Sequence, residues 1–124
     1  MKIRKGDTVE VISGDDKGVR GTVRRVYLGR DRVRRAALKG LRRLGPNHER
    51  DRVLVAGVNM IKKHQRRTGD AQSQAGIIER AAPVHLSNVA LVCPHCQRPT
   101  RVGYQILPTG SRVRVCRRCE QAVE

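Results

Sequence analysis

Hydrophobic and polar residues alternate along four short stretches of this chain. The stretches are residues 8–12, 18–26, 52–58 and 84–92, and valine or leucine occupies most of their apolar positions. A period of two is typical of a strand that is buried on one face. Glycine, proline, aspartate or asparagine stands near the ends of each stretch, as expected for turns. The pattern predicts a mainly β protein, folded as a small barrel or a curled sheet.

Residues 31–46 show a helical period instead, with apolar side chains at positions 33, 37, 41 and 44. Asp31 can cap the first turn, and Gly45–Pro46 can end the last one. We predict one amphipathic helix here, inserted into the β fold within a longer insert at about 29–52. Its basic face fits a helix laid on nucleic acid, a helix packed on its own sheet, or a helix at a membrane surface. Seven basic residues between positions 30 and 43 favour nucleic acid.

The charge of the chain indicates a polyanionic partner. Lysine and arginine total 27 against 11 acidic residues, which gives a net charge of +16. Nucleic acid and anionic membrane both fit, but no apolar run approaches spanning length and the first residues lack the apolar core of a secretory signal. The chain has no Phe and no Trp, so it has few aromatic side chains on which to stack bases. We therefore expect arginine and lysine to contact the phosphates of prefolded RNA or duplex, with no membrane partner.

The segment SGDDKG, residues 13–18, joins the first two predicted strands and overlaps the stretch GDDKGVRGTV, residues 14–23. Aspartate and glycine favour turns, because Asp hydrogen-bonds nearby backbone and Gly tolerates positive φ. Adjacent aspartates on a turn point apart, no nucleophile accompanies them, and the Walker pattern GxxxxGK[ST] is missing. We predict a simple turn from which Lys17 and Arg20 project, followed by Gly21 at a tight bend or a close approach of two backbones.

Residues 2–26 read KIRKGDTVEVISGDDKGVRGTVRRV, which resembles a KOW motif: a basic lead-in, a strand, a glycine-rich loop and a second strand. With VLVAGVNMIKKHQR, GIIERAAPVHLSNVALV and PTRVGY, about 100 of the 124 residues resemble the bacterial large-subunit ribosomal protein family numbered twenty-four. The resemblance implies an SH3-like barrel over residues 1–92. It also implies binding to large-subunit ribosomal RNA and neighbouring ribosomal proteins in the cytoplasm, early in assembly and near the mouth of the nascent-chain tunnel. A KOW-type transcription elongation or antitermination factor is the alternative.

The expected RNA contacts lie in the basic lead-in, the first turn, the second strand, the insert and a later hairpin. They are Lys2, Arg4, Lys5, Lys17, Arg20, Arg24, Arg25, Arg35, Lys39, Arg42, Arg43, Lys62, Lys63, His64, Arg66 and Arg67. The hairpin tip, about 68–76, carries no cation, so nothing there holds it to phosphate. It is either a loop that leaves the RNA surface towards the tunnel exit, as the resemblance implies, or an ordinary disordered tip.

The four cysteines form two C-x₂-C pairs in the last part of the chain: Cys93 with Cys96, and Cys116 with Cys119. This spacing is typical of a Cys₄ zinc ribbon, so we predict one structural Zn²⁺ in a zinc-ribbon-like tail, residues 93–124. Disulfides are disfavoured in a reducing cytosol, and a redox dithiol needs one pair rather than two. Because four thiolates leave no coordination position for water, we expect no zinc enzyme and no small-molecule substrate. His95 lies inside the first pair and is expected to point away from the metal.

Overall fold

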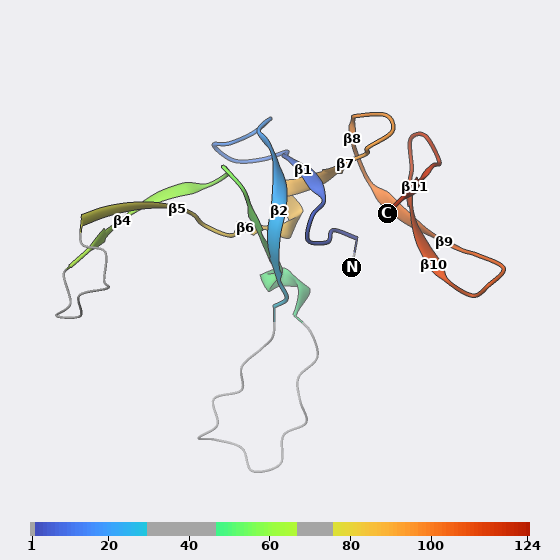
Figure 1. Ribbon diagram of the computed structural model, residues 1–124, viewed down its shortest axis with the longest axis horizontal. Helices are drawn as coiled ribbons and strands as arrows, with labels where there is room; N and C mark the ends of the chain where they lie inside the picture. Colours follow the sequence, from blue (N-terminus) through green and yellow to red (C-terminus); the bar gives the residue numbers. More distant parts are fainter. Residues whose placement is uncertain (1, 30–46, 67–75) are drawn as a thin grey trace, which may run out of the picture.

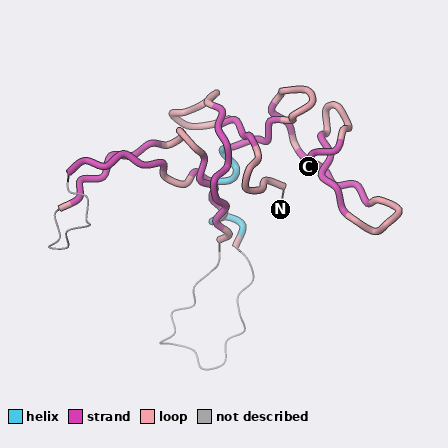
Figure 2. Tube along the Cα trace, viewed as in Figure 1, coloured by secondary structure: helices cyan, strands magenta, loops and turns pink. Residues whose placement is uncertain are grey.

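The computed structural model describes residues 2–29, 47–66 and 76–124. They form short strands joined by turns, with two 3₁₀ turns and no α-helix among them (Figure 2). The strands are β1 (Thr8–Val11), β2 (Arg20–Tyr27), β3 (Arg52–Val55), β4 (Met60–Gln65), β5 (Gly76–Ala81), β6 (Val84–His85), β7 (Val89–Val92), β8 (Pro99–Thr100), β9 (Val102–Ile106), β10 (Arg112–Cys116) and β11 (Ala122–Val123). The 3₁₀ turns are η1 (His48–Arg50) and η2 (Leu86–Asn88).

Three antiparallel sheets follow one another across the molecule. The central sheet has the order β6-β3-β2-β1-β7-β8, the hairpin is β4-β5, and the tail sheet is β11-β10-β9. The hairpin projects from one side of the central sheet and the tail sheet lies on the other side (Figure 1). The prediction of a mainly β protein is confirmed.

The central sheet is open, so the predicted SH3-like barrel is wrong in its closed form. β6 and β8 stand at the two ends of the sheet, and no ladder between described strands joins these ends. A barrel needs its end strands to hydrogen-bond to each other. Here β6 has only two residues. The chain continues from β6 through η2 into β7, and β7 does not pair with β6.

Three of the four predicted strands are confirmed as β1, β2 and β3, and the fourth is interrupted. Residues 84–92 divide into β6, η2 and β7. The ring of His85 accepts a hydrogen bond from the Ser87 N–H, and this local bond caps η2. A side chain that satisfies nearby backbone in this way competes with the regular ladder of a strand.

Valine builds the core of the central sheet. Val9, Val23, Val53, Val55 and Val58 are almost fully buried, and they pack with Ile3, Val11 and Val89. Residue 21 must be glycine because the neighbouring main chain leaves no room for a side chain: a Cβ there would lie 2.5 Å from the main-chain oxygen of Ala56. The close backbone approach predicted at Gly21 is therefore confirmed. A second buried cluster, formed by Leu91 of β7 with Val102, Val123, Cys93 and Cys116 of the tail, packs the tail against the central sheet.

The predicted helix at 31–46 falls within residues 30–46, outside the described chain, but the base of the insert is described. The Asn47 N–H donates to the carbonyl oxygen of Gly29 at 3.0 Å. The Gly29 N–H donates to Asp51 Oδ1 at 2.8 Å, and His48 Nδ1 lies 2.9 Å from Asp51 Oδ2. The buried Asp51 carboxylate therefore ties the two ends of the insert together. Its hydrogen bond with His48, followed by that from Gly29, lowers the pKa of Asp51.

The Asp51→Asn variant should lose an acid-sensitive part of the stability. Because the pKa of Asp51 is lower in the folded protein, its carboxylate stabilises the fold above the unfolded-state pKa of about 3.9, and this contribution is lost as the pH falls through the folded-state pKa. We expect Asp51→Asn to lower the free energy of unfolding by about 1–3 kcal/mol at neutral pH. Urea unfolding at several pH values should show this difference shrinking in acid. A difference that is independent of pH would contradict the assignment.

Candidate nucleic-acid interface and four-cysteine site

A β-bulge turns two successive arginines of β2 towards solvent. The register between β2 and β3 shifts between Val23 and Arg25, so Arg24 is an extra residue in the ladder. Side chains normally alternate between the faces of a strand, and a bulge re-aims one of them. Arg24 and Arg25 are therefore both exposed, and the Arg25 guanidinium lies over the Tyr27 ring, 5.2 Å from its centre.

The first turn is held in place and its cations are exposed. Asp16 accepts a hydrogen bond from the Asn59 N–H at 2.7 Å, which ties the turn to the segment before β4. Lys17 is exposed beside it. Arg20 is exposed too, but its Nε lies 2.7 Å from Glu10 Oε2, so an acidic partner on β1 already engages it. The segment is a turn, as predicted.

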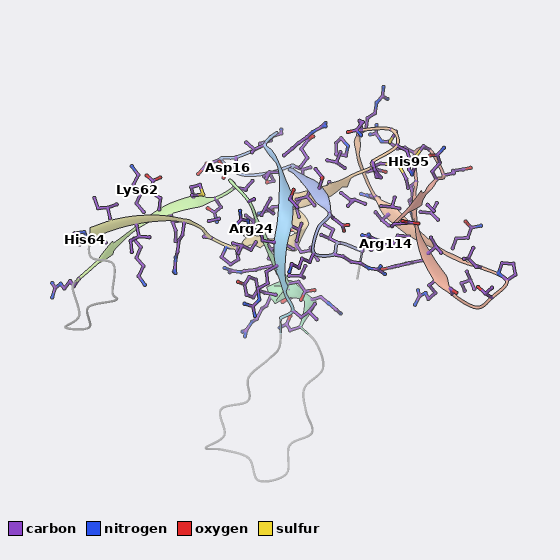
Figure 3. All side chains as sticks on the ribbon, in the orientation of Figure 1. Asp16, Arg24, Lys62, His64, His95 and Arg114 are labelled. Atoms are coloured by element: carbon purple, nitrogen blue, oxygen red, sulfur yellow. The ribbon has the colours of Figure 1, made fainter. Side chains whose placement is uncertain are left out.

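The basic lead-in is fixed by the tail. Lys2, Arg4 and Lys5 are exposed. The Arg4 N–H donates to Asp7 Oδ2 at 2.7 Å, and the guanidinium of Arg114 on β10 binds both Asp7 and the main-chain oxygen of Lys2. Figure 3 shows Arg114 between the tail sheet and the N-terminal segment. A contact from the far end of the chain therefore positions three of the predicted cations.

The hairpin presents a row of cations away from the core. Lys62, Lys63 and His64 on β4, and Arg66 just after it, are all exposed. Lys62 Nζ lies 3.7 Å from Glu79 Oε1, but both side chains are largely exposed, so this pair is worth little. The exposed Ile61 and Ile77 lie on the same hairpin. A two-stranded hairpin with so much exposed apolar surface is only marginally stable in water.

The structure thus brings the predicted cations into three exposed groups: the lead-in, the β2 surface with the turn, and the hairpin (Figure 3). The remaining candidate RNA contacts lie outside the described residues; they are Arg35, Lys39, Arg42, Arg43 and Arg67. The predicted hairpin tip also lies outside them, except for Gly76. Sequence reasoning missed Arg80 on β5, which lines an open concavity of about 780 Å³ together with Arg24. It also missed the arginines of the tail.

The four cysteine sulfurs lie together at one point of the tail. All four ligand atoms are within 4.8 Å of one another, and Cys93 Sγ is 3.6 Å from Cys119 Sγ. A tetrahedral ion with metal–sulfur bonds of about 2.3 Å needs sulfurs about 3.8 Å apart. A disulfide needs a sulfur separation of about 2.05 Å, and all four thiols are free. The group could hold a metal ion.

Both cysteine pairs sit on turns of the same construction. The Gln97 N–H donates to the Cys93 carbonyl at 2.9 Å, and the Glu120 N–H donates to the Cys116 carbonyl at 3.0 Å. Gln97 and Glu120 each follow the second cysteine of a pair, and they have nearly equal positive φ angles of 56° and 58°. The Arg118 N–H also donates to Cys116 Sγ at 3.4 Å. Two matched turns therefore face each other and present two sulfurs each.

The environment of Cys116 favours a thiolate. Burial raises the pKa of this thiol, but hydrogen bonds from the Cys119 and Arg118 N–H groups and from the Thr100 hydroxyl lower the pKa to about 6. The pKa of Cys119 shifts the other way: a hydrogen bond from the Gln121 N–H lowers it, but burial and the neighbouring Cys116 and Cys93 thiols disfavour a second negative charge there and raise it to about 11. Thiolates are the form of cysteine that binds metals. His95 does not join the sulfur group: its Nε2 lies 3.2 Å from the main-chain oxygen of Ala122. The expectation that His95 points away is confirmed.

These features define the class of the protein: a small, strongly basic β protein with KOW-like first strands and a four-cysteine tail. No helix among the described residues is long and apolar enough to cross a membrane. Residues 5–34 match the KOW motif, and residues 58–123 match the family described as large ribosomal subunit protein uL24, C-terminal domain.

Relatives match along the whole chain. The large ribosomal subunit protein uL24 of Thermomicrobium roseum is 46% identical over 123 residues, covering 99% of this chain and 90% of the relative. That of Fervidobacterium nodosum is 45% identical over 124 residues, covering 100% of this chain and 96% of the relative. That of Halothermothrix orenii is 40% identical over 124 residues, covering 100% of this chain and 99% of the relative. The chain belongs to the uL24 family of large ribosomal subunit proteins.

Proposed function

We propose that the protein is a structural constituent of the large ribosomal subunit, without catalytic activity, and that it binds large-subunit ribosomal RNA through its exposed cations. The likeness to relatives of that name over the full chain carries the proposal. The charge of +16 supports it, because such an excess opposes compaction unless a polyanion offsets it. The place of action is then the ribosome in the cytoplasm.

The contacts that we propose are those of the lead-in, the β2 surface and the hairpin. Arg24 and Arg25 are the sharpest case, because the bulge exposes both and no described ion pair engages either. The hairpin is a second proposed contact. A hairpin of this kind is only marginally stable alone, so we infer that RNA or a neighbouring ribosomal protein stabilises it in the subunit. The insert cations, early assembly and the position near the tunnel exit stay predictions from the sequence.

Replacing Arg24 and Arg25 by glutamine should weaken binding to a large-subunit RNA transcript. Each lost phosphate contact should reduce the slope of log affinity against log salt by about 1, so the double variant should lose about 2. The matched control is Arg52→Gln with Arg112→Gln, which removes the same charge from exposed positions that were not predicted to bind RNA. Filter binding over a range of salt concentrations measures both slopes. Equal slopes for the two double variants would contradict a phosphate contact at β2.

Sedimentation of a cell lysate tests the proposed function itself. The full-length protein should travel with the large ribosomal subunit and dissociate at high salt. If it instead travels with RNA polymerase, the protein is a KOW-type transcription factor and the proposal fails.

We also propose that the four cysteines hold one Zn²⁺ in a zinc-ribbon-like unit, residues 93–124, which is attached to the central sheet and contributes its end strand β8. The sulfur spacing and the matched turns support a tetrahedral ion. Four protein ligands complete the coordination of zinc, so the ion would be structural. The tail has few buried apolar side chains, and small units of this kind depend on a metal for their fold.

A further inference from the structure

An open concavity of about 450 Å³ lies where the tail meets the central sheet. Apolar side chains in or next to the sheet and three exposed arginines of the tail line it. These residues are Ile12, Ala90, Pro99, Arg101, Arg117 and Arg118, and Thr100 completes the lining. No carboxylate is among its lining residues. Three positive charges therefore face one concave surface with no acidic side chain lining it.

The guanidinium groups here have no counter-ion in the described chain. None of the ion pairs among the described residues involves Arg101, Arg117 or Arg118. Arg20 and Arg114, in contrast, are each engaged by an acidic side chain. Clustered arginines without acidic partners attract anions, and the guanidinium fork matches the geometry of phosphate.

The arginines are also held in place by the backbone. The Arg117 N–H donates to the carbonyl oxygen of Arg101 at 3.2 Å, which joins the two residues across the tail. The side chain of Arg117 passes over Gly103, with its Nε 3.5 Å from the place of a Cβ. Arg118 is held by the N–H bond to Cys116 Sγ. The cysteine turn that we assign to the metal therefore also orders two of the three arginines.

We propose that this concavity is a further phosphate-binding site, which contacts the backbone of ribosomal RNA through Arg101, Arg117 and Arg118. The inference rests on the proposed function, which supplies RNA as the ligand. The tail lies at the opposite end of the molecule from the hairpin that carries Lys62 and His64 (Figure 3). The protein would then bind RNA at two ends, through the hairpin at one end and through the arginines beside the second cysteine turn at the other.

A competing role for these arginines is to offset the negative charge of the metal-loaded cysteines. Arg117 and Arg118 lie between the ligands Cys116 and Cys119, so both roles are open to them. Arg101 lies outside both cysteine pairs, so the single variant Arg101→Gln discriminates between the roles: it should keep its metal and lose roughly eightfold in RNA affinity. If the arginines act only on the metal site, their loss weakens metal binding and leaves RNA affinity unchanged.

The test compares metal-loaded Arg101→Gln/Arg117→Gln with the control Arg52→Gln/Arg112→Gln, using a full-length transcript of large-subunit RNA. A slope of about −0.9 per phosphate corresponds to roughly eightfold in affinity per contact at 0.1 M salt. Relative to the control, the tail variant should therefore bind the transcript roughly 10- to 60-fold more weakly. Its slope of log affinity against log salt should be smaller in magnitude by about 2. Its metal content and unfolding transition should match those of the wild type.

The outcomes are distinguishable. If the wild type itself does not bind the transcript, the proposed function fails. If the wild type binds and the two double variants have the same affinity and slope, the tail site is overturned and the proposed function stands. If the tail variant loses metal while its RNA affinity is unchanged, the arginines serve the metal site and the inference is wrong.

Discussion

Replacing Arg114 by alanine is expected to lower the free energy of unfolding by about 3–5 kcal/mol. Its side chain is 1% exposed and pairs with the Asp7 carboxylate, which is 8% exposed. Both terminal guanidinium nitrogens, Nη1 and Nη2, donate to that carboxylate, at 2.5 and 3.0 Å. The same group also donates to the main-chain oxygens of Lys2 and Glu124, at 3.0 and 2.8 Å. Without the arginine, Asp7 keeps the Arg4 N–H but remains a nearly buried charge with no cation.

Denaturant unfolding of the metal-loaded protein measures this loss, and Arg112→Ala is the matched control. Arg112 lies two residues earlier on β10, is exposed, and stacks over Tyr104 at 4.8 Å. An exposed cation–π contact is worth about 0.5–1 kcal/mol, so the control should lose no more than that. Similar losses in the two variants would show that the buried pair is not what joins the tail to the central sheet.

A second variant keeps the interpretation testable if Arg114→Ala does not fold. Replacing both partners, as Asp7→Asn with Arg114→Met, should cost less than Arg114→Ala alone, because no uncompensated charge is left buried. The Nε of Arg114 is already buried without a hydrogen-bond partner, which reduces the net value of the pair. A double variant that is less stable than the single one would contradict this reasoning.

The pattern of valines was sufficient to predict β1, β2 and β3, because each strand buries one face against a single core. The limit of that reasoning is seen at residues 84–92, where the His85 side chain bonds to nearby backbone and bends the chain through η2. Barrel closure could not be read from alternation either. It depends on whether the end strands meet, which is a property of the whole sheet.

The cysteine site was predictable because its geometry is local. Each C-x₂-C pair forms its own turn, so spacing alone indicates that both sulfurs of a pair point the same way. The role of Arg114 was not predicted, since its partner Asp7 is 107 positions away. A signal does exist in RVRVC: alternation places Arg114 on the same face as the buried Cys116. A charged residue that shares a face with a metal ligand is a candidate for a buried pair.

Replacing Cys116 by serine should remove the metal and loosen the tail while the central sheet stays folded. Structural zinc sites contribute about 10–16 kcal/mol of binding free energy, and the tail cluster contains only three buried apolar residues besides cysteine. The variant should lose bound zinc, measured by elemental analysis of the purified protein. Amide exchange should become fast in β9, β10 and β11 and remain slow in β1, β2 and β3. Because Arg114 lies on β10, exchange at Asp7 and in the lead-in should also quicken.

The matched control for this variant is His95→Ala, within the other cysteine turn. His95 is exposed and contacts the main-chain oxygen of Ala122 rather than the sulfurs, so its removal should leave one zinc per chain and slow exchange in the tail. If Cys116→Ser keeps its zinc, the four-cysteine assignment is wrong. If it loses zinc while tail exchange stays slow, the ion is bound but does not support the fold. The backbone bond between Arg117 and Arg101 would then position these two arginines independently of the metal.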